Sequence, residues 1–266
     1  MSPNDAIFSL RGVTKAFAGL KVVTDVSFDV RPGERLALIG PNGAGKTTVF
    51  NLISGAYKIN EGSIILDGVD ISALPASRRC AMGIARSFQN IRLMPHLSVV
   101  ENVMIGQHAR TRGILELLTP LWMTRARQEA EAQLAAFDVA TYPNQAIATL
   151  PYGIRKKVEI VRALMSRPKV LLLDEPAAGL NTNETAQLRD FLMRVADGGV
   201  TLLVVEHDMS LVRSLCDHTV VLNFGRKIFD GPTHAVQEDP AVLEAYLGRP
   251  AHTAATPRAE TADHAS

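Results

Sequence analysis

The chain has 266 residues, of which 47% are hydrophobic and 21% charged, and its formal net charge is +1. This length can bury a core without disulfides or metals, and the composition is typical of a soluble globular protein. The near-neutral charge gives no electrostatic case for a nucleic-acid partner. Cys80 and Cys216 lie far apart without metal-ligand spacing, so we expect reduced cytosolic thiols rather than a disulfide or a zinc site.

The first forty residues predict an antiparallel β lobe. The segments IFSLRGV and VVTDVSFDV are rich in β-branched and aromatic residues, and the turn signal RPGE precedes the apolar strand RLALIG. The N-terminal stretch MSPNDAIFSL has no basic region followed by an apolar one, and the longest apolar runs are too short to span a bilayer. We therefore expect a chain that is neither exported nor inserted into a membrane.

A phosphate-binding loop is predicted directly after that strand, where GPNGAGKTT satisfies the pattern G-x-x-x-x-G-K-[ST] and a helical segment follows. In this setting glycines let backbone N–H groups surround a phosphate, Lys46 reaches the β and γ oxygens, and the Thr47 hydroxyl can ligate Mg²⁺. The alternative is a glycine-rich turn that binds nothing. The predicted nucleotide-binding residues of this loop are Gly40, Asn42, Gly43, Gly45, Lys46, Thr47 and Thr48.

A separate helical lobe is predicted from about residue 74, where segments rich in Arg, Leu and Ala are broken by prolines and glycines. With the helix start LPYGIRKKVEI, this lobe extends to about residue 165. The segment GILELLTPLWM, which contains the only tryptophan, Trp122, either extends the lobe or packs upon it.

Three short apolar strands, at 170–173, 201–205 and 219–222, predict a parallel sheet covered on both faces. The first of them ends in Asp174 and Glu175, at the edge where α/β sheets bind ligands. Asp174 could hold Mg²⁺ through water, and Glu175 could orient or deprotonate an attacking water. The alternative is a helix N-cap followed by a solvated charge.

The last segment, 250–266, is rich in Ala, Thr and Pro and has almost nothing to bury, so we expect a disordered tail after a single domain at 1–249.

Taken in order, GPNGAGKTT, RSFQN, the YGIRKKVEI helix start, LLLDEPAAGLN and VVEHDM resemble the ATP-binding subunit of an ABC transporter over about residues 7–247. The details LPYG, DEPAAGLN and the ending AYLG resemble the ATPase subunits of branched-chain amino acid importers. The resemblance implies a P-loop NTPase fold of the ABC type, with a RecA-like parallel-sheet core, an N-terminal antiparallel β lobe and a helical subdomain. It also implies ATP and Mg²⁺ as ligands.

The resemblance assigns further roles. Gln89 matches the Q-loop glutamine that senses Mg²⁺ and the attacking water, and His207 matches the switch histidine that contacts the γ-phosphate. Phe17 falls where the family places an adenine-stacking aromatic, although a buried strand-end phenylalanine would look the same. Asn181 stands where many relatives carry the D-loop aspartate, a departure that keeps hydrogen bonding but removes a charge.

The segment Leu150–Ile154 matches the family's signature motif, usually Leu-Ser-Gly-Gly-Gln, which caps the γ-phosphate bound by the opposite subunit. Leu150 and Gly153 keep the pattern, but Pro151 replaces the serine and removes a hydroxyl and a backbone N–H. The weakened cap suggests a dimer with two unequal sites. The partner would then be a second ABC ATPase, either a paralogue with a fuller signature or another copy of this chain.

The resemblance also implies integral-membrane permease subunits, an indirect periplasmic solute-binding protein, no nucleic acid, and a peripheral position on the cytoplasmic face of the inner membrane. The segment NIRLMPHLSVVENV suits a groove for a short permease helix, or else it belongs to the core of the lobe itself. An ATPase of lipopolysaccharide export, an importer of urea or amides, a soluble ABC ATPase acting on ribosomes or DNA, and a P-loop kinase are the alternatives. The sequence does not identify the cargo.

Overall fold

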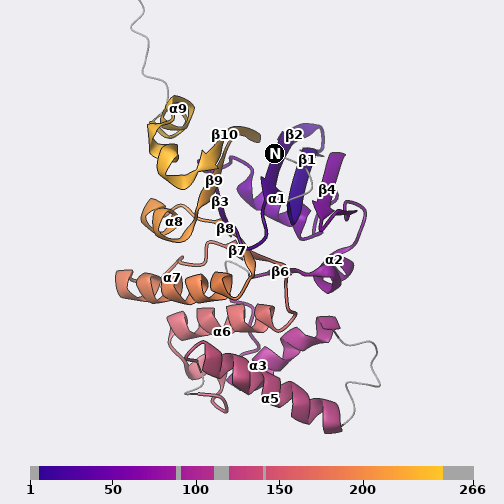
Figure 1. Ribbon diagram of the computed structural model, residues 1–266, viewed down its shortest axis with the longest axis vertical. Helices are drawn as coiled ribbons and strands as arrows, with labels where there is room; N and C mark the ends of the chain where they lie inside the picture. Colours follow the sequence, from indigo (N-terminus) through magenta and orange to yellow (C-terminus); the bar gives the residue numbers. More distant parts are fainter. Residues whose placement is uncertain (1–5, 88–90, 111–119, 140–141, 248–266) are drawn as a thin grey trace, which may run out of the picture.

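The computed structural model describes residues 6–87, 91–110, 120–139 and 142–247, so the predicted disordered tail lies outside the described residues. An antiparallel sheet lies at one end of the molecule, a second sheet in the middle and a group of helices at the other end (Figure 1). In this part of the chain, no helix has both the length and the apolar character needed to cross a membrane.

Two sheets are formed by the described residues. The antiparallel sheet has the spatial order β2 (Leu20–Val30), β1 (Phe8–Phe17), β4 (Glu61–Leu66) and β5 (Val69–Asp70). The second sheet has the order β10 (Arg226–Pro232), β9 (His218–Asn223), β3 (Arg35–Ile39), β8 (Thr201–Val205), β7 (Val170–Asp174) and β6 (Ile84–Arg86). All its neighbouring strands pair in parallel except β10, which is antiparallel to β9.

The predicted fold class is confirmed by this arrangement, with a parallel core and an N-terminal antiparallel lobe. Four strands, β4, β5, β6 and β10, were not predicted from the sequence pattern. β4 and β5 follow the phosphate-binding loop in sequence but complete the antiparallel sheet, and β6 pairs with β7 although it lies in the range assigned to the helical lobe. These strands are short or partly exposed, so they lack the continuous apolar run that marks a buried strand.

The parallel strands are buried because each contributes to two cores, one on each face of the sheet. In β7, Val170 and Leu172 join the core formed with the antiparallel lobe and α1 (Lys46–Ile53), whereas Leu171 and Leu173 join the core on the helical side. Side chains alternate between the faces of a strand, so an all-apolar sequence is needed when both faces are covered.

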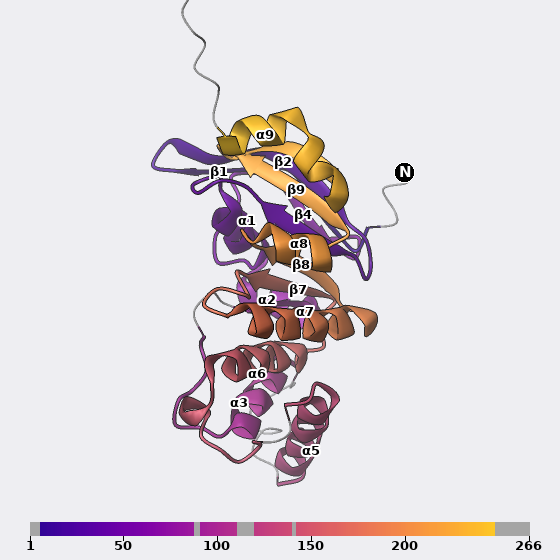
Figure 2. The ribbon, with the colours of Figure 1, turned by 90° about the vertical axis from the view of Figure 1, so that its left-hand side faces the viewer.

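The remaining helices cover the sheet and build the helical lobe. They are α2 (Ala76–Met82), α3 (Val99–Ile105), α5 (Pro120–Ala136), α6 (Tyr152–Leu164), α7 (Thr182–Asp197), α8 (Met209–Leu215), α9 (Pro240–Leu247) and the short 3-10 helices η1 (Gly106–Arg110), η2 (Ile147–Thr149) and η3 (Thr233–Glu238). Figure 2 shows α6 between α7 and α3, so α6 connects the sheet side of the molecule to the helical lobe.

A buried arginine joins α2 to the end of α1. Arg79 is only 1% exposed, and its guanidinium donates hydrogen bonds to main-chain carbonyls at the end of α1 and in the turn that leads to α2. Those acceptors are the carbonyl oxygens of Leu52, Ile53, Ser72 and Leu74. Terminal helix carbonyls have no partner within their own helix, so Arg79 satisfies groups that would otherwise be buried unpaired.

We predict that Arg79→Ala lowers the free energy of unfolding by about 3 kcal/mol, because several buried carbonyls lose their donor at once. Urea denaturation measures the change. The neighbouring exposed residue supplies a matched control, since Arg78→Ala should stay within about 0.5 kcal/mol of the wild type. A loss below about 1 kcal/mol for Arg79→Ala would show that water replaces the guanidinium without penalty.

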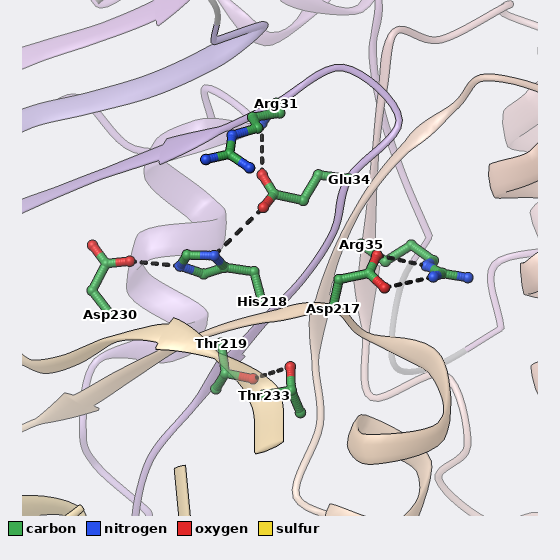
Figure 3. Close-up of polar contacts among 8 residues, drawn as sticks. All are labelled: Arg31, Glu34, Arg35, Asp217, His218, Thr219, Asp230 and Thr233. Carbon is green, nitrogen blue, oxygen red and sulfur yellow. Dashed lines mark hydrogen bonds and ion pairs between the residues drawn. The ribbon is translucent and has the colours of Figure 1, made fainter. Parts of the chain in front are cut away.

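A histidine between two carboxylates joins the β2–β3 turn to the β9–β10 hairpin (Figure 3). His218 Nε2 lies 2.7 Å from Asp230 Oδ1, and its Nδ1 lies 3.5 Å from Glu34 Oε1. Lys227 also donates to Asp230, at 2.6 Å. The hydrogen bond to Asp230 and the charge of Glu34 raise the pKa of His218, although burial opposes them. The folded chain therefore favours the imidazolium form.

We predict that His218→Gln costs more stability near pH 6 than near pH 9. A raised folded-state pKa adds stability below the unfolded value of about 6.5, and this contribution is lost as the pH rises through the folded value. Thermal unfolding of both proteins across that range gives the difference. His234→Gln, at an exposed position, is the control for loss of an imidazole. If the stability difference between the wild type and His218→Gln is the same at pH 6 and pH 9, the prediction is wrong.

Candidate functional site

The phosphate-binding loop connects β3 to α1, as the sequence predicted. Gly40, Gly43 and Gly45 all have positive φ angles, of 151°, 80° and 102°. A side chain at Gly40 is impossible without movement, because a Cβ there would lie 2.1 Å from the carbonyl oxygen of Leu222. Glycine is therefore required both for backbone conformation and for the close approach of β9.

A cavity of about 220 Å³ is lined by this loop and by the carboxylate of Glu175, the residue directly after β7. Its lining residues are Val22, Asn42, Gly43, Ala44, Gly45, Lys46, Thr47, Thr48 and Glu175. Lys46 Nζ donates to the carbonyls of Gly40 and Pro41, at 2.6 and 3.0 Å. Burial lowers the pKa of Lys46, and the charges of Glu175 and Asp174 oppose that effect. The loop amides and the ammonium group suit an anion such as a phosphate chain.

Asp174 is held by a buried ion pair at the end of β7. Its Oδ2 lies 2.6 Å from Arg86 Nη2, and the two side chains are only 9% and 10% exposed. Arg86 ends the neighbouring strand β6 and also donates to Asn51 in α1, at 2.7 Å. The alternative interpretation of Asp174 as a helix N-cap is wrong, because the next helix, α7, begins at Thr182 and its N-cap is Asn181. The ion pair fixes one carboxylate oxygen and connects three elements of the core.

Glu175 follows Asp174 in a conformation that is unusual for a residue with a side chain. Its φ angle is 45°, and its backbone N–H donates to the carbonyl of Val205 at 2.9 Å. A left-handed conformation at a non-glycine residue costs energy and is common at active sites. Here it places Glu175 at the wall of the cavity.

The donors near the cavity fit Mg²⁺ in type. Thr47 offers a hydroxyl and Asp174 a carboxylate, both hard oxygen ligands, and Mg²⁺ is commonly bound by one or two such groups together with substrate phosphates. Among the described residues no group of three or more His, Cys, Asp and Glu side chains could hold a metal ion. The hydroxyl of Thr47 and the carboxylate of Asp174 fit a magnesium ion that is delivered with a nucleotide.

Three polar residues, Glu206, His207 and Asp208, follow directly after β8. His207 is 70% exposed at its side chain and precedes Asp208, which caps α8 by accepting hydrogen bonds from Ser210 and Leu211. Glu206 is almost fully buried, and its Oε1 accepts a 2.9 Å hydrogen bond from the backbone N–H of Ala177. Burial raises the pKa of Glu206, so its carboxylate depends on the backbone amides around it.

The sequence analysis did not identify Arg86 and Glu206 as site residues. Arg86 is the first residue of the motif RSFQN, and Glu206 is the third residue of the motif VVEHDM. Each is a charged residue at the end of an apolar strand, which is a signal that could have identified them.

The signature segment of the chain lies away from the chain's own cavity. Leu150 is 6% exposed, Pro151 occupies the N-cap position of α6, and none of the described cavity-lining residues comes from 150–154. Gly153 lies against α7, where a Cβ would approach Glu184 Oε1 to 3.1 Å. Asn181, the D-loop position, caps α7 in a reciprocal box with Glu184. The segment therefore packs on the D-loop side of its own chain.

Two further predicted site residues, Phe17 and Gln89, are not among the described residues that line the cavity. Phe17 is 40% exposed at the end of β1, and its ring centroid lies 5.3 Å from that of Tyr57. It is therefore not the buried strand-end residue of the alternative interpretation, and it is also absent from the lining of the 220 Å³ cavity. Gln89 lies outside the described residues. Both cysteines are free thiols, and burial raises the pKa of Cys216 to about 12.

The strand–loop–helix phosphate site, together with an acid that follows a second strand of the same sheet, defines the class of P-loop nucleotide-binding proteins. Comparison agrees, because the family profile described as ABC transporter matches residues 23–178, more than half of the chain. The chain therefore belongs to the ABC transporter family, as an ATP-hydrolysing cassette. A second profile, described as branched-chain amino acid ATP-binding cassette transporter, matches residues 226–252.

Three named ATP-binding proteins of transport systems are similar to this chain over most of its length. The chain is similar to BraF of Pseudomonas aeruginosa, a high-affinity branched-chain amino acid transport ATP-binding protein, with 40% identity over 91% of this chain and 98% of BraF. It is also similar to LivG of Escherichia coli, likewise a high-affinity branched-chain amino acid transport ATP-binding protein, with 36% sequence identity over 91% of this chain and 98% of LivG. LptB of Haemophilus influenzae, a lipopolysaccharide export system ATP-binding protein, is 32% identical, again over 91% and 98%.

A solved structure has the same fold. It is a nucleotide-free ATP-binding cassette from an ABC transporter, which superimposes with a TM-score of 0.82 at 29% identity and covers 91% of this chain and 99% of its own.

We predict that Arg86→Gln lowers the free energy of unfolding by about 3 kcal/mol, because it leaves the buried Asp174 carboxylate without its cation. Adding Asp174→Asn should recover more than half of that loss, since the uncompensated charge is then removed. Chemical denaturation of the two single variants and the double variant completes the cycle. Losses that simply add would mean that the two side chains do not interact.

Proposed function

We propose that the chain is the ATPase subunit of a bacterial importer for branched-chain or related amino acids. The observation that carries the proposal is the 220 Å³ cavity, which Lys46 and Thr47 line together with Glu175, the residue directly after β7. The match of the branched-chain amino acid profile to 226–252, and the higher identity to BraF and LivG than to LptB, support the cargo class.

In the proposed reaction the loop glycines, Asn42 and Lys46 hold the β- and γ-phosphates, with Thr48 beside them. Lys46 exchanges its present bonds to the Gly40 and Pro41 carbonyls for phosphate oxygens. Thr47 and Asp174 would hold Mg²⁺, which would supply neutralisation of the negative charge on the phosphate chain.

Glu175 then orients a water and accepts its proton as the water oxygen bonds to the γ-phosphorus, while the bond to the ADP oxygen breaks. His207 and Gln89 contact the γ-phosphate and the water. The exposed position of His207 at the start of α8 leaves its ring available for that contact. Phe17 stacks on the adenine from the end of β1, where its ring is part-exposed.

The site of one chain is incomplete, because no residue of 150–154 lines its own described cavity. We propose that Leu150, Gly153 and the amides at the start of α6 act on the nucleotide of a second ABC ATPase subunit, and that ATP closes the pair while hydrolysis reopens it. Pro151 makes this chain's cap the weaker one, so a paralogous partner with a fuller signature fits better than a second copy.

A groove of about 660 Å³ separates the core from the helical lobe, and it suits a permease contact on the cytoplasmic face of the inner membrane. Arg92, which belongs to the segment 90–103 that the sequence predicted for this role, lines the groove, as do Ile105, two residues beyond that segment, and Arg162 of α6. Because the groove has both apolar and cationic walls, a short amphipathic helix with an acidic end fits it.

We predict that a strain lacking this gene loses uptake of labelled leucine, and that wild type restores it while Glu175→Gln does not. Removing the catalytic carboxylate should lower ATP hydrolysis by about a hundredfold or more. In the purified protein, nucleotide binding should survive in Glu175→Gln, because the phosphates are held by the loop.

Substitution of Pro151 should reduce hydrolysis less than Glu175→Gln, and equal effects would contradict the unequal-site hypothesis. Uptake of labelled urea is the parallel measurement. If leucine uptake is unchanged in the deletion strain, the importer proposal for branched-chain amino acids is wrong, and a lipopolysaccharide export defect becomes the next measurement.

A further inference from the structure

A buried acid directly after β8 binds main chain from two different strand ends. Glu206 is 1% exposed. Its Oε1 accepts a hydrogen bond from the backbone N–H of Ala177 at 2.9 Å, and its Oε2 accepts one from the backbone N–H of His207 at 3.2 Å. One carboxylate therefore holds the chain two residues after Glu175 and the backbone of His207 as well.

These two bonds stand where the hydrogen-bond ladder between β7 and β8 would continue. The regular ladder reaches the Glu175 N–H, which donates to the Val205 carbonyl at 2.9 Å. In a continuing parallel ladder, the His207 N–H would next donate to the Glu175 carbonyl, and the Ala177 N–H to the His207 carbonyl. Here the Glu206 carboxylate accepts from both N–H groups instead. The two strand ends can therefore separate without leaving either donor unpaired.

The separation begins at Glu175, whose backbone is left-handed with a φ angle of 45°. Pro176 follows and has no N–H, so the next N–H that can hold this turn belongs to Ala177. The Glu175 carbonyl accepts from the N–H of Ala178 at 3.1 Å, which closes the turn over the proline. A strained residue persists only where its surroundings fix it. The bond from Ala177 to Glu206 attaches the far end of the strained turn to the end of β8.

A carboxylate suits this position better than a neutral side chain. Burial raises the pKa of Glu206, and the N–H groups of Ala177 and His207 oppose that effect. A glutamine would offer one acceptor oxygen, and its NH₂ group would lie against the second donor. Hydrogen bonds to an ionised acceptor are also stronger than bonds between neutral groups. The acid is therefore matched to two main-chain donors at once.

We propose that Glu206 is a positioning residue for ATP hydrolysis, which holds Glu175 in its left-handed conformation by binding the Ala177 N–H. The inference rests on the proposed function of Glu175. Glu206 is not among the described residues that line the 220 Å³ cavity, so it acts through Glu175 and not on the nucleotide. A displacement of about 1 Å in a reacting group can cost about a hundredfold in rate, so loss of this buried acceptor is enough to impair the reaction.

The test compares variants of the full chain, purified together with its partner subunits. Glu206→Ala removes both acceptor oxygens, and Glu206→Gln keeps one. Thr219→Val is the matched control, because it removes a buried 2.8 Å hydrogen bond to Thr233 near the amino end of β9, at the opposite edge of the same sheet. Steady-state ATP hydrolysis gives kcat and KM, and fluorescent ATP binding in EDTA reports on the phosphate loop alone.

For Glu206→Ala we expect kcat to fall by about tenfold or more, while KM and metal-free ATP binding change less than about threefold. Glu206→Gln should give an intermediate kcat, and Thr219→Val should match the wild type. Circular dichroism checks that each variant is folded, and Glu206→Gln carries the test if Glu206→Ala is not.

A double variant separates positioning from a general structural role. When Glu175 is already replaced by glutamine, Glu206→Ala should lower the residual single-turnover rate by less than about threefold, because the group that Glu206 positions is gone. A structural defect would instead lower the rate by the same factor in both backgrounds.

An unchanged kcat in Glu206→Ala would overturn the proposal, and so would an equal fold-loss in the wild-type and Glu175→Gln backgrounds. A Glu175→Gln variant that hydrolyses ATP at the wild-type rate would instead contradict the proposed function of Glu175, so the two failures can be told apart.

Discussion

A parallel sheet covered on both faces can carry polar chemistry only where its strands end, and this constraint organises the molecule. β3, β8, β7 and β6 are consecutive neighbours in the sheet, and each delivers a polar group at its carboxyl end. These groups are the phosphate loop after β3, Glu206 after β8, Asp174 in β7 and Arg86 in β6. Adjacent strands lie about 4.8 Å apart, so four strand ends suffice to build one compact site.

The charges of this site are already paired within the chain. Lys46 is bound to loop carbonyls, Asp174 to Arg86, and Glu206 to the N–H of Ala177. A ligand must therefore exchange one set of polar partners for another, and the net free energy is the difference between the two sets. Such pairing keeps the geometry nearly fixed before binding, which is the condition under which electrostatic stabilisation of a reaction is largest.

The helical lobe adds a second constraint, because α6 packs against α7 on one side and α3 on the other. Its N-terminal residues contact the D-loop side, where Tyr152 lies against Gly179 and Gly153 against Glu184, and a later turn holds Arg92. One helix therefore joins the segment proposed to serve a second subunit to the backbone of Arg92.

The sequence by itself determined the features that are local in the chain. The phosphate loop, the two acids at the end of β7 and the parallel strands could each be predicted from a short stretch of sequence. This is possible because the apolar residues of a buried strand and the glycines of a turn are consecutive in the chain. Only the tertiary structure decided the Arg86–Asp174 ion pair, the position of β4 in the antiparallel sheet and the hydrogen bonds between α6 and the backbone of Arg92. The two paired contacts join residues 88 and 67 positions apart. Periodicity describes only the element in which a residue lies, so the partner that a buried charge finds is decided by how the elements pack.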